Sequence, residues 1–229
     1  MVAVNDVSFA IPPQGITALC GPNGAGKTTL LNVIAGSTGC DSGEVIFAGD
    51  ALGSSRPEER FRRGISRTFQ AIHLVKSRSV VDNVAVACLS TKQNGLVRGF
   101  GRNRIRLARE EALQALDELD LVPFAWELVG TLTLETQRLV ELARALASHP
   151  RLLVLDEPAS GLSSSERVRL QEVLVEVGKN VAVLLVEHDL QLVRSIAERV
   201  LVLEHGSLIF DGASTSFTSL AELTGISTR

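Results

Sequence analysis

The sequence has 229 residues, of which 45% are hydrophobic and 21% are charged, and its formal net charge is −3. This length and composition are typical of a globular protein with one substantial core, and we expect one domain with an insertion. The small negative charge offers no general electrostatic attraction for nucleic acid, so we expect no nucleic-acid partner.

The cysteines and the apolar runs argue against a disulfide-rich protein and against a membrane-spanning protein. Cys20, Cys40 and Cys88 are an odd number at wide spacings, which argues against a disulfide framework or a cysteine metal site and fits reduced thiols in the cytosol. The longest apolar runs, such as residues 181–186, are far shorter than the ~20 residues that span a bilayer, and the N-terminus lacks the pattern of a signal peptide. We therefore expect any membrane association to come through a partner.

The first elements predicted along the chain are a strand, a glycine-rich turn and a helix. Residues 16–20 are apolar, and residues 28–36 have helical apolar spacing that ends at Gly36. Residues 44–50 and 64–70 are each predicted to form a further strand, with glycine and proline between them.

From about Lys76 the pattern becomes helical. Residues 79–90 are predicted to form a helix, and residues 105–121 have a strong periodicity of 3.6 residues. A loop rich in glycine and arginine lies between these two segments. The sequence thus predicts a helical insertion.

Three apolar strands are predicted next, at residues 151–157, 181–189 and 199–206, with helical segments between them. This alternation predicts a parallel sheet that is covered on both faces. Ser163 and Glu166 have the spacing of a capping box at the start of the helix between the first two strands.

The predicted fold is therefore α/β, with a mainly parallel sheet flanked by helices and a helical insertion subdomain. We expect the core to comprise residues 1–72 and 140–229, and the insertion to comprise residues 73–139. The Ser- and Thr-rich tail after Gly212 is expected to be a loosely held terminus.

The glycine-rich turn, GPNGAGKT at residues 21–28, matches the phosphate-binding pattern GxxxxGK(S/T) and lies between a strand and a helix as that pattern requires. Its glycines let backbone N–H groups turn inward around phosphates, and the helix that follows places its positive dipole end there. Lys27 supplies a positive charge between the β- and γ-phosphates, and the Thr28 hydroxyl ligates Mg²⁺. The cofactors expected are ATP and Mg²⁺. The residues expected to bind the nucleotide are Gly21, Asn23, Gly24, Ala25, Gly26, Lys27, Thr28 and Thr29.

Two acids and a histidine follow other predicted strands. Asp156 ends an apolar strand, where it can hold the Mg²⁺ shell, and Glu157 beside it can polarise the attacking water. Adjacent acids after a strand are more often solvated loop residues, but the phosphate-binding pattern in the same chain reverses that preference. His188 ends a further apolar strand, where an imidazole can donate to the γ-phosphate or to the water. The other three histidines are expected to be structural: His73, His149 and His205.

These segments together resemble a known family. The order and approximate spacing of GPNGAGKTT, the SRTFQ that contains Gln70, ARAL, LLVLDEP, SGL and VEHD resemble those of ABC transporter ATP-binding subunits over nearly the whole chain. The stretches AVNDVSF, RTFQ and ELARALASHPRLLVLDEPASGL are most similar to the ATPase subunits of branched-chain amino acid importers and their relatives for other amides and urea.

The resemblance implies the fold of an ABC ATPase, a P-loop NTPase, and a cytoplasmic subunit peripheral on the inner face of the cell membrane. Such a subunit pairs with a second ATPase, identical or not, docks on membrane permeases, and is served indirectly by a solute-binding protein. Gln70 would contact Mg²⁺ or the water and report nucleotide state through the insertion, so the implied metal contacts are Thr28, Gln70 and Asp156. Glu157 would be the general base, and His188 the switch histidine.

The chain departs from the family at the signature segment. The family's LSGGQ falls on Leu132, Thr133, Leu134, Glu135 and Thr136, of which Leu132 alone matches, with Thr133 as a hydroxyl substitute. In the family this segment faces the nucleotide bound by the partner. A carboxylate ~4 Å from a phosphate charge at an effective dielectric constant of 20 is repelled by about 4 kcal/mol, so a catalytically weak site is expected. The alternative is that Glu135 caps the helix and swings away from the nucleotide.

Further departures concern single positions. Ser163 stands where the family has an aspartate that crosses the dimer interface. The family stacks adenine on an aromatic residue upstream of the stretch that AVNDV resembles, whereas Phe9 has the pattern of a core residue. Either Met1 is a late start, or the chain is a piece of a longer or fused protein, or other contacts hold adenine.

Basic residues gather in the insertion, and their role is open. They either form a solvated face or contact lipid headgroups or the permease. The cluster comprises Arg98, Arg102, Arg104, Arg106 and Arg109.

Three functions remain in view. The leading hypothesis is an importer ATPase that hydrolyses Mg·ATP. The alternative is a catalytically impaired nucleotide-binding assembly subunit. The third, a non-transport ABC ATPase acting on nucleic acid or translation, is disfavoured by the net charge and by the single cassette. A GTPase is disfavoured because no NKxD-type motif occurs.

Overall fold

A computed structural model of the chain describes residues 2–91 and 102–217. Its centre is a six-stranded sheet in the order β4-β5-β6-β1-β7-β8. The first five strands in this order are parallel, and β8 is antiparallel to β7. The strands are β4 (Ile65–Arg67), β5 (Leu152–Asp156), β6 (Ala182–Val186), β1 (Gly15–Cys20), β7 (Arg199–Glu204) and β8 (Ser207–Ala213), and a separate two-stranded sheet contains β2 (Ile46–Phe47) and β3 (Asp50–Ala51).

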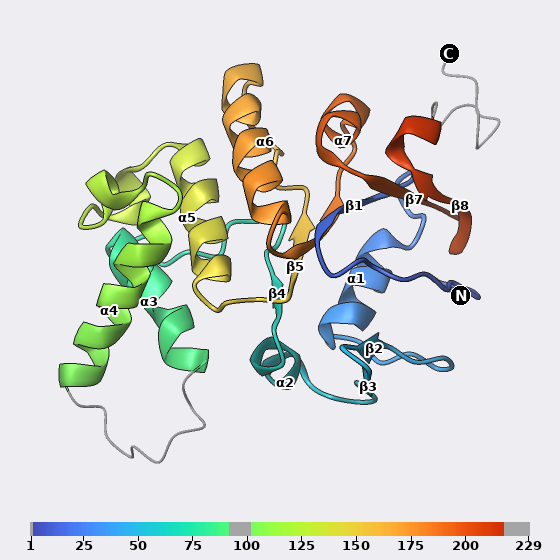
Figure 1. The fold of residues 1–229 in the computed structure, drawn as a ribbon, viewed down its shortest axis with the longest axis horizontal. Helices are drawn as coiled ribbons and strands as arrows, with labels where there is room; N and C mark the ends of the chain where they lie inside the picture. The colour runs from blue at the N-terminus through green and yellow to red at the C-terminus, as the bar shows by residue number, and fades with distance from the viewer. Residues whose placement is uncertain (1, 92–101, 218–229) are drawn as a thin grey trace.

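Helices flank the main sheet (Figure 1). Helices α6 and α7 lie on one side of the sheet, α1 lies on the other, and α3, α4 and α5 form a helical group beside the edge where β4 and β5 lie. The α-helices are α1 (Lys27–Ala35), α2 (Pro57–Arg62), α3 (Val80–Thr91), α4 (Arg102–Asp117), α5 (Leu134–Leu146), α6 (Ser164–Gly178) and α7 (Leu190–Ile196), and the short 3-10 helices are η1 (Val122–Phe124), η2 (Val129–Thr131) and η3 (Ser214–Ser216). The predicted α/β fold with a helical insertion is confirmed.

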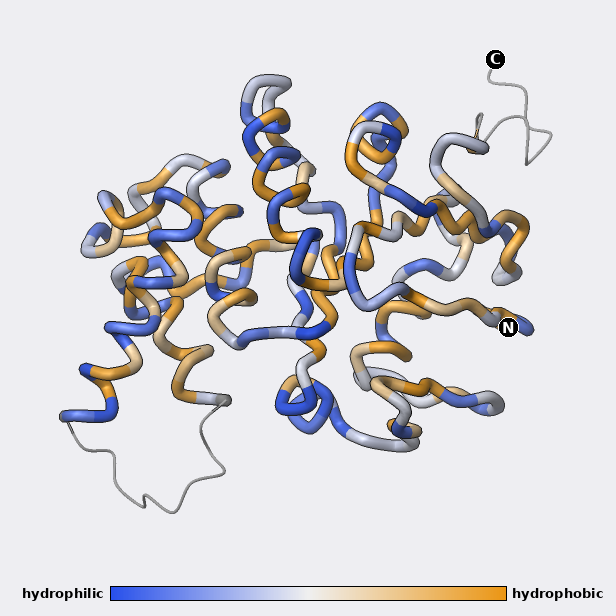
Figure 2. Tube along the Cα trace, in the orientation of Figure 1, coloured by the Kyte–Doolittle hydropathy of each residue, from blue (hydrophilic) through white to orange (hydrophobic). Residues whose placement is uncertain are grey.

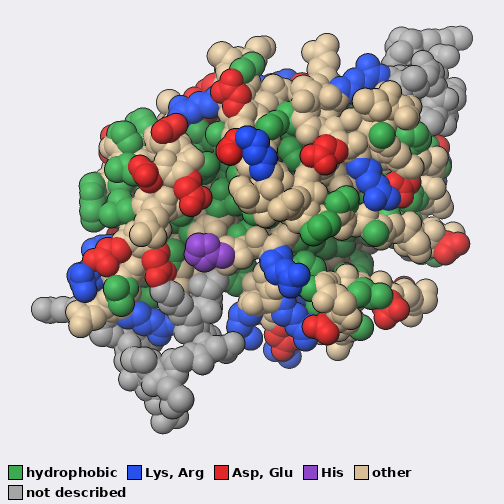
Figure 3. Space-filling view, in the orientation of Figure 1, with side chains coloured by type: hydrophobic (Ala, Val, Ile, Leu, Met, Phe, Trp, Pro, Cys, Tyr) green, Lys and Arg blue, Asp and Glu red, His purple; other side chains and the backbone are tan. Residues whose placement is uncertain are grey.

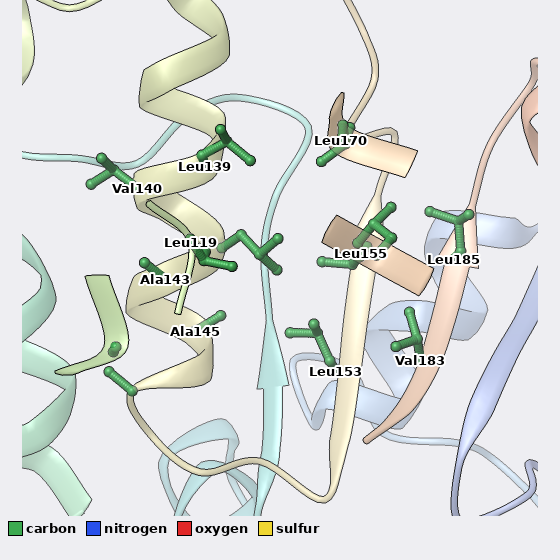
Figure 4. Packing of buried hydrophobic residues seen from close by; sticks show 14 of the residues in the cluster. Leu119, Leu139, Val140, Ala143, Ala145, Leu153, Leu155, Leu170, Val183 and Leu185 are labelled. Carbon is green, nitrogen blue, oxygen red and sulfur yellow. The ribbon is translucent and has the colours of Figure 1, made fainter. Parts of the chain in front are cut away.

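Strand β5 shows how the sequence builds a sheet with two covered faces. Successive side chains of a strand point to opposite faces. Leu153 and Leu155 belong to the hydrophobic cluster that contains α5 and α6 residues, whereas Leu152 and Val154 belong to the cluster on the α1 side. Figure 4 shows the first of these clusters, with Leu153 and Leu155 between the α5 side chains and those of β6. Because each face of β5 is covered, every residue of the apolar run from Leu152 to Leu155 is buried on one face or the other.

The insertion shares its core with the sheet. One cluster of buried side chains contains Val84 of α3, Leu116 of α4, Leu139 of α5 and Leu153 of β5. Burying each such side chain stabilises the fold by about 1.5–3 kcal/mol. Figure 2 shows the same pattern as a hydropathy trace, in which hydrophobic colour lies along the inner strands and alternates with polar colour along the surrounding helices. The insertion is thus packed onto the sheet edge by apolar contact.

Two strand predictions were wrong in detail because of turns with left-handed backbone. Residues 44–50 do not form one strand, since Ala48 (φ 55°) and Gly49 (φ 90°) turn the chain between β2 and β3. His205 (φ 47°) and Gly206 (φ 80°) likewise turn the chain from β7 into β8, a strand that the sequence did not predict. Two consecutive residues with positive φ make the turn that best fits a twisted hairpin.

The chain after Gly212 is also more ordered than predicted up to Phe217. Strand β8 continues to Ala213, and the ring of Phe217 is 3% exposed and lies 5.8 Å from that of Phe210. Arg194 of α7 donates to the carbonyl of Phe217 at 3.3 Å. Residues 218–229 lie outside the described part of the chain.

Charges on the face in Figure 3 are interspersed, with basic, acidic and hydrophobic side chains alternating across it. In the basic cluster of the insertion, Arg104 donates to the carbonyl of Leu89 at 3.1 Å, and Arg106 pairs with Glu110 at 2.7 Å. Arg98 and the side chain of Arg102 lie outside the described residues. Within residues 2–91 and 102–217, every helix is too short or too polar to cross a membrane.

Candidate functional site

The predicted site residues meet at the carboxyl ends of four adjacent parallel strands. Strands β4, β5, β6 and β1 are neighbours in this order, and Asp156 at the end of β5 is in register with Val186 at the end of β6. Gln70 follows β4, Glu157 follows β5 and His188 follows β6, while the glycine-rich loop follows β1. In sheets of this kind, ligands bind outside the carboxyl ends of the strands.

The glycine-rich loop has a backbone that only glycine can adopt at two positions. Gly21 has φ 147°, and a Cβ there would lie 2.1 Å from the carbonyl oxygen of Leu203. Gly26 has φ 102°, and a Cβ there would lie 2.3 Å from the carbonyl oxygen of Ala3. Gly24 has φ 80° and open space around it. The glycines therefore allow close packing at the base of the loop and leave its outer side clear for a ligand.

Helix α1 begins directly after this loop and has an uncompensated N-terminus. Its N-cap is Gly26, no side chain caps it, and its first turn has no acidic residue. The first N–H groups of a helix lack partners within the helix and carry the positive end of its dipole, so they suit an anion. The residues present therefore fit a bound phosphate chain.

Lys27 occupies the inside of the loop. Its Nζ donates to the carbonyl oxygens of Gly21 at 2.7 Å and Pro22 at 2.9 Å, and the residue is 7% exposed. Burial lowers the pKa of Lys27, and the negative charge of Glu157 partly opposes this effect. The Lys27 ammonium can exchange its two carbonyl partners for phosphate oxygens, which are stronger acceptors because they are charged.

The other predicted loop residues have different environments. Asn23 and Thr28 are exposed, Thr29 is half-buried, and Ala25 is 2% exposed. The N–H of Ala25 donates to the carbonyl of Pro22 at 3.2 Å, so it is used within the loop.

Glu157 brings the three predicted catalytic residues together. Its Oε2 accepts a hydrogen bond from Gln70 Nε2 at 2.7 Å, and its Oε1 lies 2.7 Å from His188 Nε2. An ionised carboxylate is an acceptor only, so the His188 contact requires the proton on Nε2. The Glu157 N–H donates to the carbonyl of Val186 at 2.9 Å, which ties the turn after β5 to β6. The carboxylate is thus held from three neighbouring strand ends.

Asp156 has a partner that the sequence did not reveal. Arg67 of β4 donates to Asp156 Oδ2 at 3.1 Å and to Asn32 Oδ1 on α1 at 2.7 Å. The Arg67 side chain is 7% exposed and lies over the ring of Phe69, with 5.0 Å between its Cζ and the ring centroid. The signal available in the sequence was an arginine within the strand predicted at residues 64–70. Arg67 therefore links the helix of the phosphate loop to the acid expected to hold the metal shell.

A second residue missed from the sequence is Glu187, which directly precedes His188. It is 5% exposed and accepts hydrogen bonds from the N–H groups of Ala159 at 2.9 Å and His188 at 3.3 Å. Burial raises the pKa of Glu187, while these two hydrogen bonds act in the opposite direction. Glu187 thereby fixes the turn after β5 against the turn that presents His188.

The oxygen donors available for a metal ion suit Mg²⁺. Thr28 presents an exposed hydroxyl at the first turn of α1, and Asp156 and Gln70 lie at adjacent strand ends. In the described part of the chain no three His, Cys, Asp or Glu side chains converge on a point. Mg²⁺ normally retains several waters and binds through one or two carboxylates together with substrate phosphates, so this sparse donor set fits it.

The signature segment lies at the N-terminal end of α5, in the helical group beside the edge of the sheet where β4 and β5 lie (Figure 1). Thr133 is the N-cap, and its Oγ1 accepts a hydrogen bond from the Thr136 N–H at 3.2 Å. Thr133, and not Glu135, is therefore the N-cap residue, while Glu135 lies in the first turn, where a carboxylate is favoured by the helix dipole. The Glu135 carboxylate lies in the first turn, 3.8 Å from Arg169 of α6.

Two neighbours of Glu135 complete this end of α5. Leu134 is 40% exposed, and its Cδ2 would lie 3.0 Å from a Cβ at Gly161. Ser163 is the N-cap of α6: its Oγ accepts from the Glu166 N–H at 3.5 Å and its N–H donates to Glu166 Oε2 at 2.7 Å, which confirms the predicted capping box. Its hydroxyl also donates to Glu166 Oε2 at 2.6 Å. The Ser163 hydroxyl is thus engaged within its own helix.

The remaining histidines have structural surroundings. His149 (φ 50°) and His205 (φ 47°) adopt left-handed backbone in turns. The backbone of His73 is bound by side chains of α5.

Comparison with known proteins gives consistent matches over most of the chain. The family model described as ABC transporter matches residues 4–160. The high-affinity branched-chain amino acid transport ATP-binding protein BraF of Pseudomonas aeruginosa is 35% identical over 219 residues, which cover 93% of this chain and 86% of BraF.

Solved structures that are similar to this chain are also cassettes of ABC transporters. The ADP conformation of an ATP-binding cassette of an ABC transporter has a TM-score of 0.83 and 27% identity, covering 97% of this chain and 91% of that chain. A dimeric bacterial ABC transporter cassette has a TM-score of 0.75 and 25% identity, covering 93% of this chain and 90% of that chain.

Proposed function

This chain belongs to the ABC transporter family, and on that premise we propose that it is the ATP-binding and ATP-hydrolysing subunit of an importer for branched-chain amino acids or related small polar solutes. The solute class rests on the similarity to BraF over most of both chains. The proposed ATP hydrolysis is supported above all by one observation. The Glu157 carboxylate forms hydrogen bonds with both Gln70 and His188, close to the loop that contains Lys27.

In the proposed reaction the phosphate chain of ATP lies in the glycine-rich loop. Lys27 moves its ammonium from the loop carbonyls to the β- and γ-phosphate oxygens, and the N-terminus of α1 donates to the same anion. Mg²⁺, when bound, supplies charge neutralisation between the phosphates, and Thr28, Gln70 and Asp156 would hold it and its waters. Arg67 keeps Asp156 oriented toward this position.

Glu157 acts as the general base. Its carboxylate orients a water for attack on the γ-phosphate and accepts the water's proton, as the bond from the water oxygen to the γ-phosphorus forms and the bond from that phosphorus to ADP breaks. His188 and Gln70 hold the two carboxylate oxygens of Glu157, and both side chains can turn to donate to the γ-phosphate or the water when ATP binds. Glu187 supports this geometry by fixing the His188 N–H.

We further propose that the chain acts as one half of a dimer of ATPases on membrane permeases, peripheral on the cytoplasmic face. The dimeric cassette with 25% identity supports the dimer. Residues 1–72 and 140–229 would form the nucleotide-binding core and residues 73–139 the insertion, with α5 running across the boundary between them.

A second candidate function is that of a nucleotide-binding assembly subunit with little turnover. The end of α5 favours it, because Glu135 presents a carboxylate and Leu134 a large side chain where the family has glycine, and because the Ser163 hydroxyl is engaged by Glu166. Loss of one preorganised donor costs about 2.7–4 kcal/mol of transition-state stabilisation, or roughly 100- to 1,000-fold in rate. In the proposed dimer, the N-terminal end of α5 would complete the nucleotide site of the partner ATPase, so the loss of rate would occur at that site.

Steady-state ATP turnover separates the two functions. We expect this chain, assembled with the second ATPase and the permeases, to hydrolyse ATP, and Glu157→Gln to remove most of that turnover. Glu176→Gln, at an exposed ion pair on α6, is the matched control and should change nothing. ATP binding without turnover in the assembled complex would establish the assembly role instead.

A further inference from the structure

Three charged residues of α5 lie apart from the site residues assigned above. Arg138, Glu141 and Arg144 are spaced by three residues, so they share one side of the helix. The side chains are 8%, 3% and 26% exposed, respectively. Burial raises the pKa of Glu141 and lowers that of Arg144. Charges buried to this degree are costly unless they are paired and hydrogen-bonded, so their contacts indicate their purpose.

Arg138 binds the beginning of the segment after β4. Its Nη2 donates to the carbonyl of Gln70 at 2.7 Å, and its Nη1 lies 3.4 Å from the carbonyl of Phe69. The same Nη1 lies 3.6 Å from Glu141 Oε2. The backbone that carries the Gln70 side chain is therefore attached to α5 by a charge-assisted hydrogen bond.

Glu141 and Arg144 bind the end of the same segment. Glu141 Oε1 accepts a hydrogen bond from the N–H of His73 at 3.1 Å, and Arg144 donates to the carbonyl of His73 at 2.5 Å. Glu141 Oε1 and Arg144 Nη2 are 3.6 Å apart. Both backbone polar groups of His73, its N–H and its carbonyl, are thus held by neighbouring charges of α5.

Residues 69–73 depend on these contacts for their position. The segment has no helix or strand, and in the described ranges the hydrogen bonds recorded for its backbone all involve the three α5 side chains. The side chain of Gln70 bonds Glu157 on the opposite side. Gln70 therefore connects α5, through its backbone, to the proposed general base, through its amide.

We propose that Arg138, Glu141 and Arg144 are positioning residues that fix Gln70 to α5, so that the distance between the Gln70 amide and Glu157 follows the position of this helix. Glu141 is central because it neutralises both arginines and binds His73 directly. Since α5 begins with the signature segment, and Arg138 follows Leu134 by about one helical turn, a displacement of that end of the helix is carried directly to Gln70. This assignment rests on the function proposed for Gln70 and Glu157.

Amide hydrogen exchange tests the attachment without any need for turnover. In the full chain, Glu141→Ala should make the His73 amide, whose N–H donates to Glu141, exchange about tenfold faster, as expected for the loss of one hydrogen bond. Glu141→Gln keeps an acceptor and the side-chain volume, so it should fold readily and give a smaller increase. Asp211→Asn, a carboxylate-to-amide change in the Arg199 pair at the opposite edge of the sheet, should leave this segment unchanged. Unaltered exchange of the His73 amide in both Glu141 variants would overturn the proposal.

A double-mutant cycle tests whether the attachment acts through Gln70. The quantity measured is the gain in ATP affinity on addition of Mg²⁺. Gln70→Ala and Glu141→Gln should each lower this gain by about three- to tenfold, and the double variant should lower it no further, because both remove the same placement of Gln70. A Glu141 residue that merely stabilised the fold would either leave the gain unchanged or act additively with Gln70→Ala, and both results would refute the coupling.

The two experiments also separate this proposal from the function on which it rests. If the unmodified protein failed to bind ATP, the proposed function would fail, while the exchange measurement would still decide whether α5 holds residues 69–73.

Discussion

The strand ends around the phosphate loop and the N-terminal end of α5 are both expected to face nucleotide, yet they are built differently. At the strand ends, Lys27, Arg67 and Asp156 have buried side chains with fixed partners, in the contacts of Lys27 with the loop carbonyls and of Arg67 with Asp156. At the end of α5, Leu134 is exposed and the Glu135–Arg169 pair is 3.8 Å long and partly solvated.

This difference follows from the source of the geometry. The phosphate loop is positioned by a sheet whose strands are buried on both faces, so its shape is set by backbone and glycine. The end of α5 is a helix terminus, where each residue is free to change as long as the cap remains. A substitution at the first region should therefore alter folding and binding strongly, and one at the second should be tolerated by the fold.

The largest effect is expected at Arg67. Arg67→Met leaves the Asp156 carboxylate without its buried partner, and breaking such a pair costs about 3–5 kcal/mol of unfolding free energy. Denaturant unfolding would measure this loss. Adding Asp156→Asn should recover part of the stability, because the unpaired charge is then removed. A double variant no more stable than Arg67→Met would contradict the explanation.

The next effect concerns ligand affinity. Lys27→Ala removes charge-assisted hydrogen bonds to phosphate, and each is worth about 1.5–3 kcal/mol, so ATP affinity should fall roughly 10- to 150-fold. Titration calorimetry on the purified chain would measure it. Lys179→Ala, at an exposed pair with Glu176, is the control. Equal affinity in the Lys27 variant and the unmodified protein would refute the phosphate site.

At the end of α5 the expected effect is small. Arg169→Ala removes the partner of Glu135, and because both side chains are partly exposed, the cost should be below about 1 kcal/mol. Salt should shrink it further, since the Debye length is about 3 Å at 1 M. A thermal-unfolding series in salt would show this. A larger loss of stability that salt does not reduce would mean that the Glu135–Arg169 pair contributes as strongly as the buried pairs at the strand ends, and would contradict the comparison.

The smallest effect is a dependence on pH. Burial raises the pKa of Glu187 above its ordinary value of 4.5, so its protonated form is favoured in the folded state. Its contribution to stability is fully present below pH 4.5 and is lost as the pH rises through the raised pKa. The melting temperature of the protein relative to Glu187→Gln should therefore increase as the pH is lowered from 7 toward 4.5. A difference that is constant with pH would contradict the raised pKa.

Sequence patterns predicted the features that local chemistry determines. The glycine pattern and Lys27 identify the phosphate loop because no other residues fit that backbone, and the uninterrupted apolar runs identify β5, β6 and β7 because both faces of these strands are buried. The order of the parallel strands then brings Glu157 and His188 together.

Contacts between distant segments could not be predicted in this way. The Arg67–Asp156 pair joins residues 89 positions apart, and the Glu141–His73 hydrogen bond joins residues 68 apart. The first pair depends on β4 lying beside β5, and the second on how α5 packs against the segment after β4. No periodicity in the sequence records either arrangement. The strand β8 was missed because the His205–Gly206 turn lacks the usual asparagine or aspartate signal.

Glu157 adopts a left-handed backbone conformation, with φ 50°. For a residue with a side chain this conformation costs roughly 1–2 kcal/mol, a penalty that glycine avoids. A Glu157→Gly protein should therefore withstand heat better than the original while losing hydrolysis. In the turn after β5, glycine would make the fold more stable to heat, whereas glutamate supplies the proposed general base. The sequence has the residue that serves catalysis at the expense of stability.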